Sequence, residues 1–208
     1  MLLPYKTIAR RSETETVINR SRFIGRAYPV QTEDEALSIL AAIRKQHYDA
    51  THNCFAYIIK DGAARFSDDG EPSGTAGMPI MEVLKSRELV NTLVIVTRYF
   101  GGILLGAGGL VRAYSGSCAD AVRAAVPVSI LPGTKLTLSL DYSRYNALED
   151  FLRANAVISD IRYAENVTLT LLIKSSKLDK FISDITEKTD GRIIPDVCGE
   201  EYMQTDDE

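Results

Sequence analysis

The feature that most restricts the fold of this chain is a glycine-rich segment between an apolar run and a helical pattern. Five glycines fall within residues 101–109 of the stretch 97–116, TRYFGGILLGAGGLVRAYSG. The run before it, 93–96 (LVIV), is short and β-branched, which is typical of a buried strand. After it, apolar residues recur at spacings of three and four from about 110 to 125, which predicts a helix. A strand, a glycine-rich turn and a helix therefore follow one another.

Such a turn can do two different things. Glycines allow positive φ angles or a close approach of backbone that a Cβ would block, so tight packing alone explains them. The start of a helix also presents free N–H groups and the positive end of its dipole, so the turn could accept an anion. Arg98 and Arg112 bracket it and would add positive charge. Neither the P-loop nor the dinucleotide fingerprint fits the segment, and both interpretations stay open.

A second glycine-rich segment, residues 67–80 (SDDGEPSGTAGMPI), contains three carboxylates and precedes a predicted helix at about 76–86. Asp68, Asp69 and Glu71 could hold a hard cation such as Mg²⁺ through oxygen. Their spacing is unlike that of an EF-hand, however, and a turn in which Asp side chains accept hydrogen bonds from nearby N–H groups is favoured. We therefore expect no metal and no other cofactor.

The histidines and cysteines form no complete catalytic or metal site. His52 and Cys54 lie two residues apart, and on a strand such residues point to the same face. They could form a nucleophile pair or half a zinc site, but no second pair of ligands exists. With Cys118 and Cys198 the cysteines are three, an odd and scattered set that argues against a disulfide framework and suits a reducing compartment.

The N-terminal part, residues 1–130, is predicted to mix strands and helices. Strands are expected at 14–19 and 23–29, and again at 54–60 and 64–67 around an Asp-Gly turn. Thr32 and Glu35 form a capping box for a helix that runs to about residue 48.

The C-terminal part, residues 131–200, follows a proline- and glycine-containing boundary at 126–133. Strands are expected at 134–140, 157–163, 167–173 and 192–197, with helices capped by Ser143 and Ser176. This β-α-β-β-α-β order predicts a ferredoxin-like domain with one free sheet face, to which a protein partner could bind. Residues 201–208 are expected to form an acidic tail.

The charge differs between the two parts. Residues 1–130 contain 15 Lys and Arg against 13 Asp and Glu, a net of +2, whereas residues 131–208 contain 9 against 15, a net of −6. The N-terminal part is thus the one that could contact phosphate. The first residues lack the apolar region of a signal peptide and no long apolar stretch follows, so we expect a cytoplasmic protein with no membrane contact.

The two glycine-rich segments together resemble the signature of the IMPACT family, in its bacterial, two-domain form. His52 and Cys54 also fall where that family has a histidine-x-cysteine pair. The positions that match the first motif are Arg98, Gly101, Gly102, Gly106, Gly108, Gly109 and Arg112. Those that match the second motif are Asp68, Asp69, Gly70, Glu71, Gly74, Thr75 and Gly77.

The resemblance implies an α+β protein of two domains. Its N-terminal domain would be similar to the α+β sandwich shared by ribosomal proteins and domain IV of elongation factor G, and its C-terminal domain to that factor's last domain. Eukaryotic IMPACT proteins regulate translation under amino-acid starvation by competing for the activator of an initiation-factor kinase. The resemblance does not include the eukaryotic RWD-type domain, so that partner is not transferred to this chain.

The leading hypothesis is a protein that binds RNA or the ribosome and modulates translation, with phosphates held at the glycine-rich turn by Arg98 and Arg112. The alternative is an enzyme that acts on a small phosphorylated or nucleotide ligand, with Mg²⁺ held by Asp68, Asp69 and Glu71. A binding protein is favoured over an enzyme. A protein-interaction module that uses the free sheet of the C-terminal domain is the third hypothesis.

Overall fold

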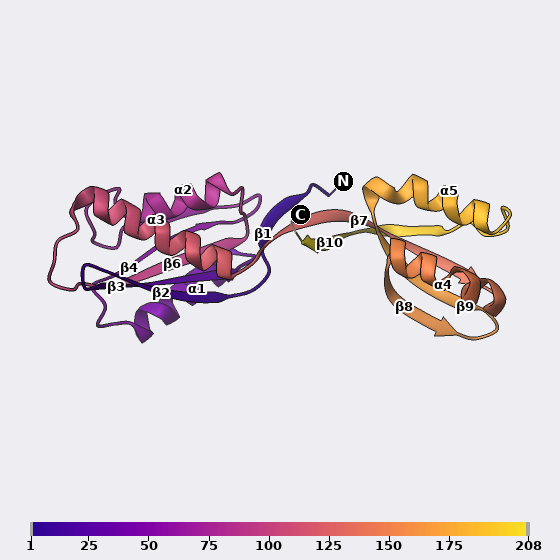
Figure 1. Cartoon of the computed structure of the whole chain (residues 1–208), viewed down its shortest axis with the longest axis horizontal. Coiled ribbons are helices and arrows are strands. Elements are labelled where there is room, and N and C mark those ends of the chain that lie inside the picture. The colour runs from indigo at the N-terminus through magenta and orange to yellow at the C-terminus, as the bar shows by residue number, and fades with distance from the viewer. Residues whose placement is uncertain (1, 207–208) are drawn as a thin grey trace. The chain divides into compact units, whose positions relative to one another are not determined.

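The computed structural model describes residues 2–206, which form two compact units (Figure 1). The N-terminal unit comprises residues 5–129, and the C-terminal unit comprises residues 130–205 with those up to Pro4. Each unit contains both helices and strands, which confirms the expected α+β class and two-domain architecture. No helix within residues 2–206 is long and apolar enough to cross a membrane.

The N-terminal unit is built on a five-stranded antiparallel sheet. The strand order is β2-β3-β6-β4-β5, so that β6, the strand before the glycine-rich turn, lies in the middle. The elements of this unit are β1 (Tyr5–Ile8), β2 (Ser12–Ile18), β3 (Ser21–Pro29), α1 (Glu33–Gln46), β4 (His52–Ile58), β5 (Ala64–Ser67), α2 (Gly77–Ser86), β6 (Thr92–Tyr99) and α3 (Gly106–Ala124).

Helices cover both faces of this sheet. Val94 and Val96 of β6 pack into the core formed with α2 and α3, whereas Leu93 and Ile95 pack into the core formed with α1 (Figure 1). Because successive side chains of a strand point to opposite faces, Arg98 follows Val94 and Val96 to the side of α2 and α3. Burial on both faces explains why β6 is an uninterrupted apolar run.

Local sequence signals account for the ends of several elements. Asn19 and Arg20, with φ of 46° and 65°, form the two-residue turn between β2 and β3. The Thr32 hydroxyl accepts a hydrogen bond from the Glu35 N–H at 3.2 Å, as in the predicted capping box. The Glu35 carboxylate, however, accepts from the N–H of Gln31, one residue before the expected partner.

The C-terminal unit has the strand order β10-β7-β9-β8, which with the order of its elements is the expected ferredoxin-like β-α-β-β-α-β arrangement. Residues of both long helices and of the strands share one apolar core. Hydroxyl side chains occupy the opposite face, where Thr137 pairs with Thr170. Its elements are β7 (Pro127–Leu140), α4 (Tyr142–Asn155), β8 (Val157–Tyr163), β9 (Val167–Lys174), the short 3₁₀ helix η1 (Ser175–Lys177), α5 (Leu178–Lys188) and β10 (Asp196–Asp206).

Several boundaries in this part differ from the expectations. The boundary expected at 126–133 does not interrupt the secondary structure, because residues 127–133 are the first half of β7. Asp141, and not Ser143, caps α4, because its carboxylate accepts from the Arg144 N–H at 2.8 Å. Ser176 caps nothing, since η1 leads directly into α5.

The last strand was also misplaced. β10 begins at Asp196 and extends to Asp206, so residues 201–206 of the expected acidic tail are strand, and residues 207–208 lie outside the described part. Backbone pairing with β7 outweighs the unfavourable strand propensity of these acidic residues. Whether a protein partner uses the hydroxyl-lined face of this sheet stays a prediction.

Candidate functional site

The two glycine-rich motifs meet at one pocket of the N-terminal unit, a point that the sequence alone left open. The pocket has a volume of about 380 Å³ and lies between the start of α3 and the loop before α2. His52, at the start of β4, completes its wall. The lining residues are Thr51, His52, Gly70, Glu71, Pro72, Arg98, Phe100, Leu104, Leu105, Gly106, Ala107 and Leu110. Most of this wall is apolar.

The turn between β6 and α3 depends on its glycines in two ways. A Cβ on Gly101 would lie 2.1 Å from the carbonyl carbon of Arg20, so only glycine lets the turn pack against the β2–β3 turn. Gly102 and Gly106 have φ of 82° and 69°, which other residues rarely adopt. The helix begins at Gly106 and not near residue 110, so Gly108 and Gly109 lie in its first turn.

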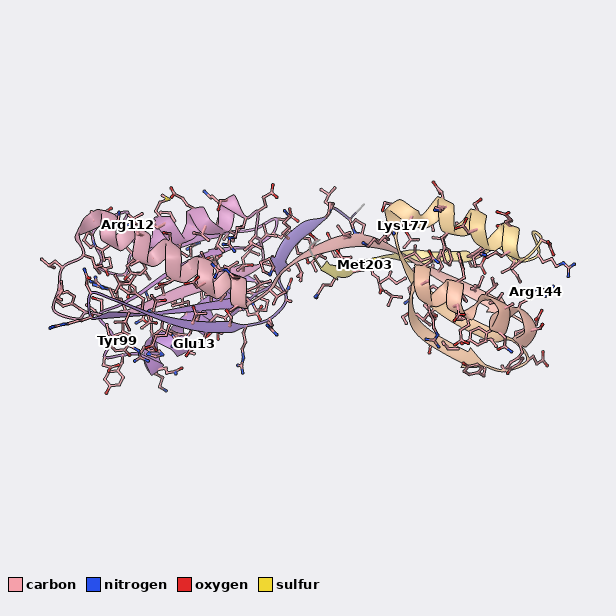
Figure 2. The ribbon with its side chains drawn as sticks, viewed as in Figure 1. Glu13, Tyr99, Arg112, Arg144, Lys177 and Met203 are labelled. Atoms are coloured by element: carbon pink, nitrogen blue, oxygen red, sulfur yellow. The ribbon has the colours of Figure 1, made fainter. Side chains whose placement is uncertain are left out.

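The start of α3 has no side-chain cap and no acidic residue in its first turn. The free N–H groups expected there are thus not engaged by a cap. The exposed Arg112 follows on the same helix (Figure 2). Its Nη1 would be 3.6 Å from a Cβ on Gly108, which means that the guanidinium group folds back over the first turn. A helix start and a cation therefore lie together, as expected for the anion interpretation.

Arg98 lies in a different place from the one expected for a phosphate ligand. It is buried, and its Nη1 donates to Oε1 of Glu71 at 2.7 Å. The side chains of the pair are 6% and 3% exposed. The positive charge is thus neutralised within the protein, and Arg98 positions Glu71. The Nε of Arg98 is buried without a hydrogen-bond partner among the described residues.

Glu71 is the centre of a buried polar network. The Tyr114 hydroxyl of α3 donates to the same Oε1 at 2.8 Å. Arg98 also donates from Nη2 to the Ser21 hydroxyl at 3.3 Å, and that hydroxyl accepts a further bond from the Gly101 N–H at 3.2 Å. The network links the second motif, β3, β6 and α3. It therefore connects the two glycine-rich motifs.

His52 supplies the remaining polar group of the pocket. Its Nδ1 lies 2.8 Å from the backbone carbonyl oxygen of Asp69. A carbonyl can only accept, so Nδ1 bears a proton and donates it. The other ring nitrogen, Nε2, lies 3.7 Å from Oε2 of Glu71. Both residues line the pocket, and the His52 side chain is 18% exposed.

Asp68 and Asp69 stabilise the loop. The Asp68 carboxylate accepts from the N–H groups of Gly74, Ala76 and Gly77 at 2.8–3.0 Å, which caps α2. Asp69 accepts from the Asn53 N–H at 2.7 Å and from Arg44 at 2.6 Å. This is the hydrogen-bonded turn that the sequence favoured over a cation site. Across residues 2–206, no cluster of three or more His, Cys, Asp and Glu side chains could hold a metal ion.

The other residues of the second motif shape the same loop. Gly70 and Gly74 have φ of 88° and 77°. The Thr75 hydroxyl donates to the Pro72 carbonyl at 2.6 Å. A Cβ on Gly77 would lie 2.7 Å from the backbone of Ser67, so this glycine lets α2 begin close to β5.

Cys54 is not arranged as a nucleophile. Its thiol is fully buried and donates to the Asp68 carbonyl at 2.9 Å. Burial raises the pKa of the Cys54 thiol to about 12. Because the thiolate is the reactive form, the pair of Cys54 with His52 does not support covalent catalysis.

A second polar network, which the sequence did not indicate, lies on the opposite face of the sheet. Arg26 is 2% exposed and donates from Nε to Glu13 at 2.6 Å, while its Nη2 lies 2.7 Å from Nε2 of His47. His47 Nδ1 lies 2.9 Å from the Tyr99 hydroxyl. Figure 2 shows Glu13 and Tyr99 on the side of α1, away from Arg112.

Other residues of the site were also missed. Tyr114 appeared only as a member of the apolar helix stripe, and Ser21 had no distinguishing signal. The sequence did contain one signal, the apolar residues within the glycine-rich turn. The structure exposes two of them: Phe100 is 46% exposed and Leu104 is 85% exposed. Large apolar side chains at the edge of a pocket often mark a binding surface.

Known proteins with similar sequences give the chain its family. Residues 19–122 match the Impact N-terminal domain, and residues 138–192 match a domain of unknown function, DUF1949. The chain is 43% identical to the IMPACT family member YvyE of Bacillus subtilis, over 92% of this chain and 90% of that protein. It is 33% identical to YigZ of Escherichia coli, over 85% and 89%.

A mammalian relative covers a smaller share of this chain. Protein IMPACT of Rattus norvegicus is 35% identical over 42% of this chain and 29% of its own length. A crystal structure described as that of a hypothetical protein matches 95% of this chain and 98% of its own, with a TM-score of 0.60 and 30% identity. The chain belongs to the IMPACT family.

Proposed function

We propose that this protein binds single-stranded RNA through the pocket between the two glycine-rich motifs, and that ribosomal or messenger RNA bound there links it to translation. The observation behind this proposal is the convergence of an apolar pocket, an uncapped helix start and an exposed arginine at one place. Phosphate binds helix starts and arginine, whereas bases stack on exposed aromatic side chains. The resemblance to a domain of elongation factor G favours the ribosome as the source of the RNA.

Neighbouring side chains extend the same surface. Arg20 is exposed at the β2–β3 turn, directly behind Gly101. Arg20 and Arg112 therefore border a turn whose outer side chains are Phe100, Ile103 and Leu104, which are 41–85% exposed. Cations next to stacking surfaces are the usual composition of a single-strand binding site.

The alternative, an enzyme that uses Mg²⁺, has less support. Its three carboxylates are engaged by backbone N–H groups, by Arg44 and by Arg98, respectively. A cation would have to displace these partners. The RNA hypothesis is therefore the better supported of the two.

The test is the affinity for a short single-stranded RNA across a salt series, measured by fluorescence anisotropy. Arg112→Ala should weaken binding and reduce the slope of log K against log salt by roughly 0.7, the value for one lost phosphate contact on a single strand. Arg98→Ala is unsuitable, because it would break a buried ion pair.

A matched control lies on the same helix. Arg123 is exposed near the end of α3, where it pairs with Asp120 at 3.1 Å. Arg123→Ala should leave both affinity and slope near those of the wild type. Binding that does not weaken as salt increases, or that falls equally in both variants, would refute the proposal.

A further inference from the structure

The wall of the pocket contains two hydrogen-bond acceptors that face each other. Nε2 of His52 and Oε2 of Glu71 are separated by 3.7 Å. Nδ1 of His52 already donates to the Asp69 carbonyl, so neutral His52 presents an unprotonated Nε2. Both atoms belong to residues that line the pocket.

The second oxygen of Glu71 differs from the first in its partners. Oε1 accepts from Arg98 and from Tyr114. Within residues 2–206, Oε2 receives no such hydrogen bond, and its polar neighbour is His52 Nε2. The Glu71 side chain is 3% exposed, and Oε2 is the oxygen that it presents to His52. An acceptor at the wall of a pocket can take a hydrogen bond from a donor on a ligand.

The charge of this pair determines what can approach it. A phosphate would be repelled by the Glu71 carboxylate, so it must remain at the start of α3 near Arg112. Among the groups of an RNA strand, those that can approach His52 and Glu71 are uncharged hydrogen-bond donors. The two ends of the pocket thus select different parts of one ligand.

A hydroxyl group suits this pair better than an N–H group. It can donate to Oε2 of Glu71 and, whenever His52 is protonated, it can also accept from Nε2. A base N–H can only donate, so it cannot accept a hydrogen bond from a protonated Nε2. In RNA, the group that combines these properties and lies close to the phosphate is the ribose 2′-hydroxyl.

We propose that His52 and Glu71 recognise a ribose 2′-hydroxyl, so that the protein distinguishes RNA from DNA. This inference rests on the RNA binding proposed above and adds the chemical group that the pocket selects. The 2′-hydroxyl is the feature by which a protein can tell RNA from DNA at a given site.

The experiment compares three single strands of one sequence at one salt concentration: RNA, 2′-fluoro RNA and DNA. The 2′-fluoro strand keeps an RNA-like sugar but cannot donate a hydrogen bond. Wild-type protein should bind RNA about tenfold or more tightly than the other two, as expected for a hydrogen bond to a charged acceptor. Affinities are measured by fluorescence anisotropy on the full chain.

Two variants remove the acceptors separately. Glu71→Gln replaces one carboxylate oxygen by an NH₂ group and retains the other oxygen as the acceptor for Arg98 and Tyr114. His52→Phe removes Nε2 and retains a planar ring. In each variant the ratio of RNA affinity to 2′-fluoro affinity should fall close to one, whereas Arg112→Ala should weaken all strands and retain the ratio. Thermal unfolding verifies that each variant is folded, and one folded variant of the two is enough to test the ratio.

The outcomes separate this inference from the proposed function. Equal wild-type affinity for the three strands overturns the inference and leaves RNA binding intact. A ratio that persists in folded His52→Phe or Glu71→Gln also overturns it. If wild-type protein binds none of the strands, the proposed function fails and the inference fails with it.

Discussion

Glu71 and Arg98 form a buried ion pair, 2.7 Å between Oε1 and Nη1, that connects one glycine-rich motif to the other. Glu71 lies in the loop before α2, and Arg98 is on β6, the central strand of the sheet. Tyr114 and Ser21 form further hydrogen bonds with the pair. The ion pair therefore sets the position of the pocket wall relative to the sheet.

Removing one partner of this pair should destabilise the N-terminal unit strongly. Arg98→Met would leave the Glu71 carboxylate buried without its cation, and such changes cost about 3–5 kcal/mol. The double variant with Glu71→Gln should lose less, because no charge then remains unpaired. Urea unfolding followed by circular dichroism measures both.

An exposed pair on the same sheet provides the control. Arg22 and Glu15 lie 2.8 Å apart and both side chains are about half exposed. Arg22→Met should change stability far less than Arg98→Met, since solvent screens that pair. Similar losses in the two variants would contradict the assignment of a buried, structural pair.

Gly101 should tolerate no side chain. A Cβ there would approach the Arg20 backbone to 2.1 Å, so Gly101→Ala has to displace the β2–β3 turn or the β6–α3 turn. Overpacking of this kind costs about 1–3 kcal/mol. Gly116, inside α3, has nothing within 4 Å of the same position, and Gly116→Ala should stabilise by about 0.5–1 kcal/mol. Thermal unfolding of both variants tests the contrast, and a stable Gly101→Ala protein would contradict the close approach.

Local signals predicted most elements of this fold, because they depend on near neighbours in the sequence. The alternation in β9, the capping box at Thr32 and the Asp-Gly turns are all formed within a few residues. The misplaced β10 is different. Its pairing with β7 brings together residues about 60 positions apart, such as Thr137 and Cys198, whose side chains lie 3.0 Å from each other. The acidic residues within 201–208 suggested a tail, because no local pattern reports that pairing.

The pocket shows the same limit of prediction from local sequence patterns. The motif residues were identifiable from the sequence, but their meeting depends on the pairing of β4 with β6, which places His52 opposite Arg98. The roles of the individual motif residues were harder still to predict. Arg98 and Arg112 are equal as cations in the sequence, and only the arrangement of strand and helix buries one and exposes the other.

The three cysteines should differ in reactivity. Burial raises the pKa of Cys54 and of Cys118 to about 12, whereas Cys198 is exposed. A thiol reagent at neutral pH should modify one cysteine in the folded protein and three after denaturation. Cys198→Ser should abolish the reaction of the folded protein. Fast reaction of that variant would show that Cys54 or Cys118 is accessible, and modification of Cys54 would reopen the nucleophile hypothesis.

His47 should titrate below the ordinary histidine range. Burial lowers its pKa from 6.5, and the positive charge of the neighbouring Arg26 lowers it further, while Glu13 and Asp49 act in the opposite direction. The folded protein therefore binds fewer protons at this site than the unfolded chain. Stability from His47 is fully present above pH 6.5, declines as the pH falls towards the lowered native pKa, and levels off below it.

Proton NMR measures this directly, because the chain has only two histidines, His47 and His52. His47→Gln assigns the ring signals by removing one set. The wild-type signal that this variant lacks belongs to His47, and it should titrate with a pKa below 6.5. Arg26→Gln should raise that pKa by removing the adjacent positive charge. A wild-type pKa at or above 6.5 would contradict the prediction, because it would mean that Glu13 and Asp49 outweigh burial and Arg26. The free energy of unfolding of the wild type, compared with that of His47→Gln, would then show no extra loss between neutral and mildly acidic pH.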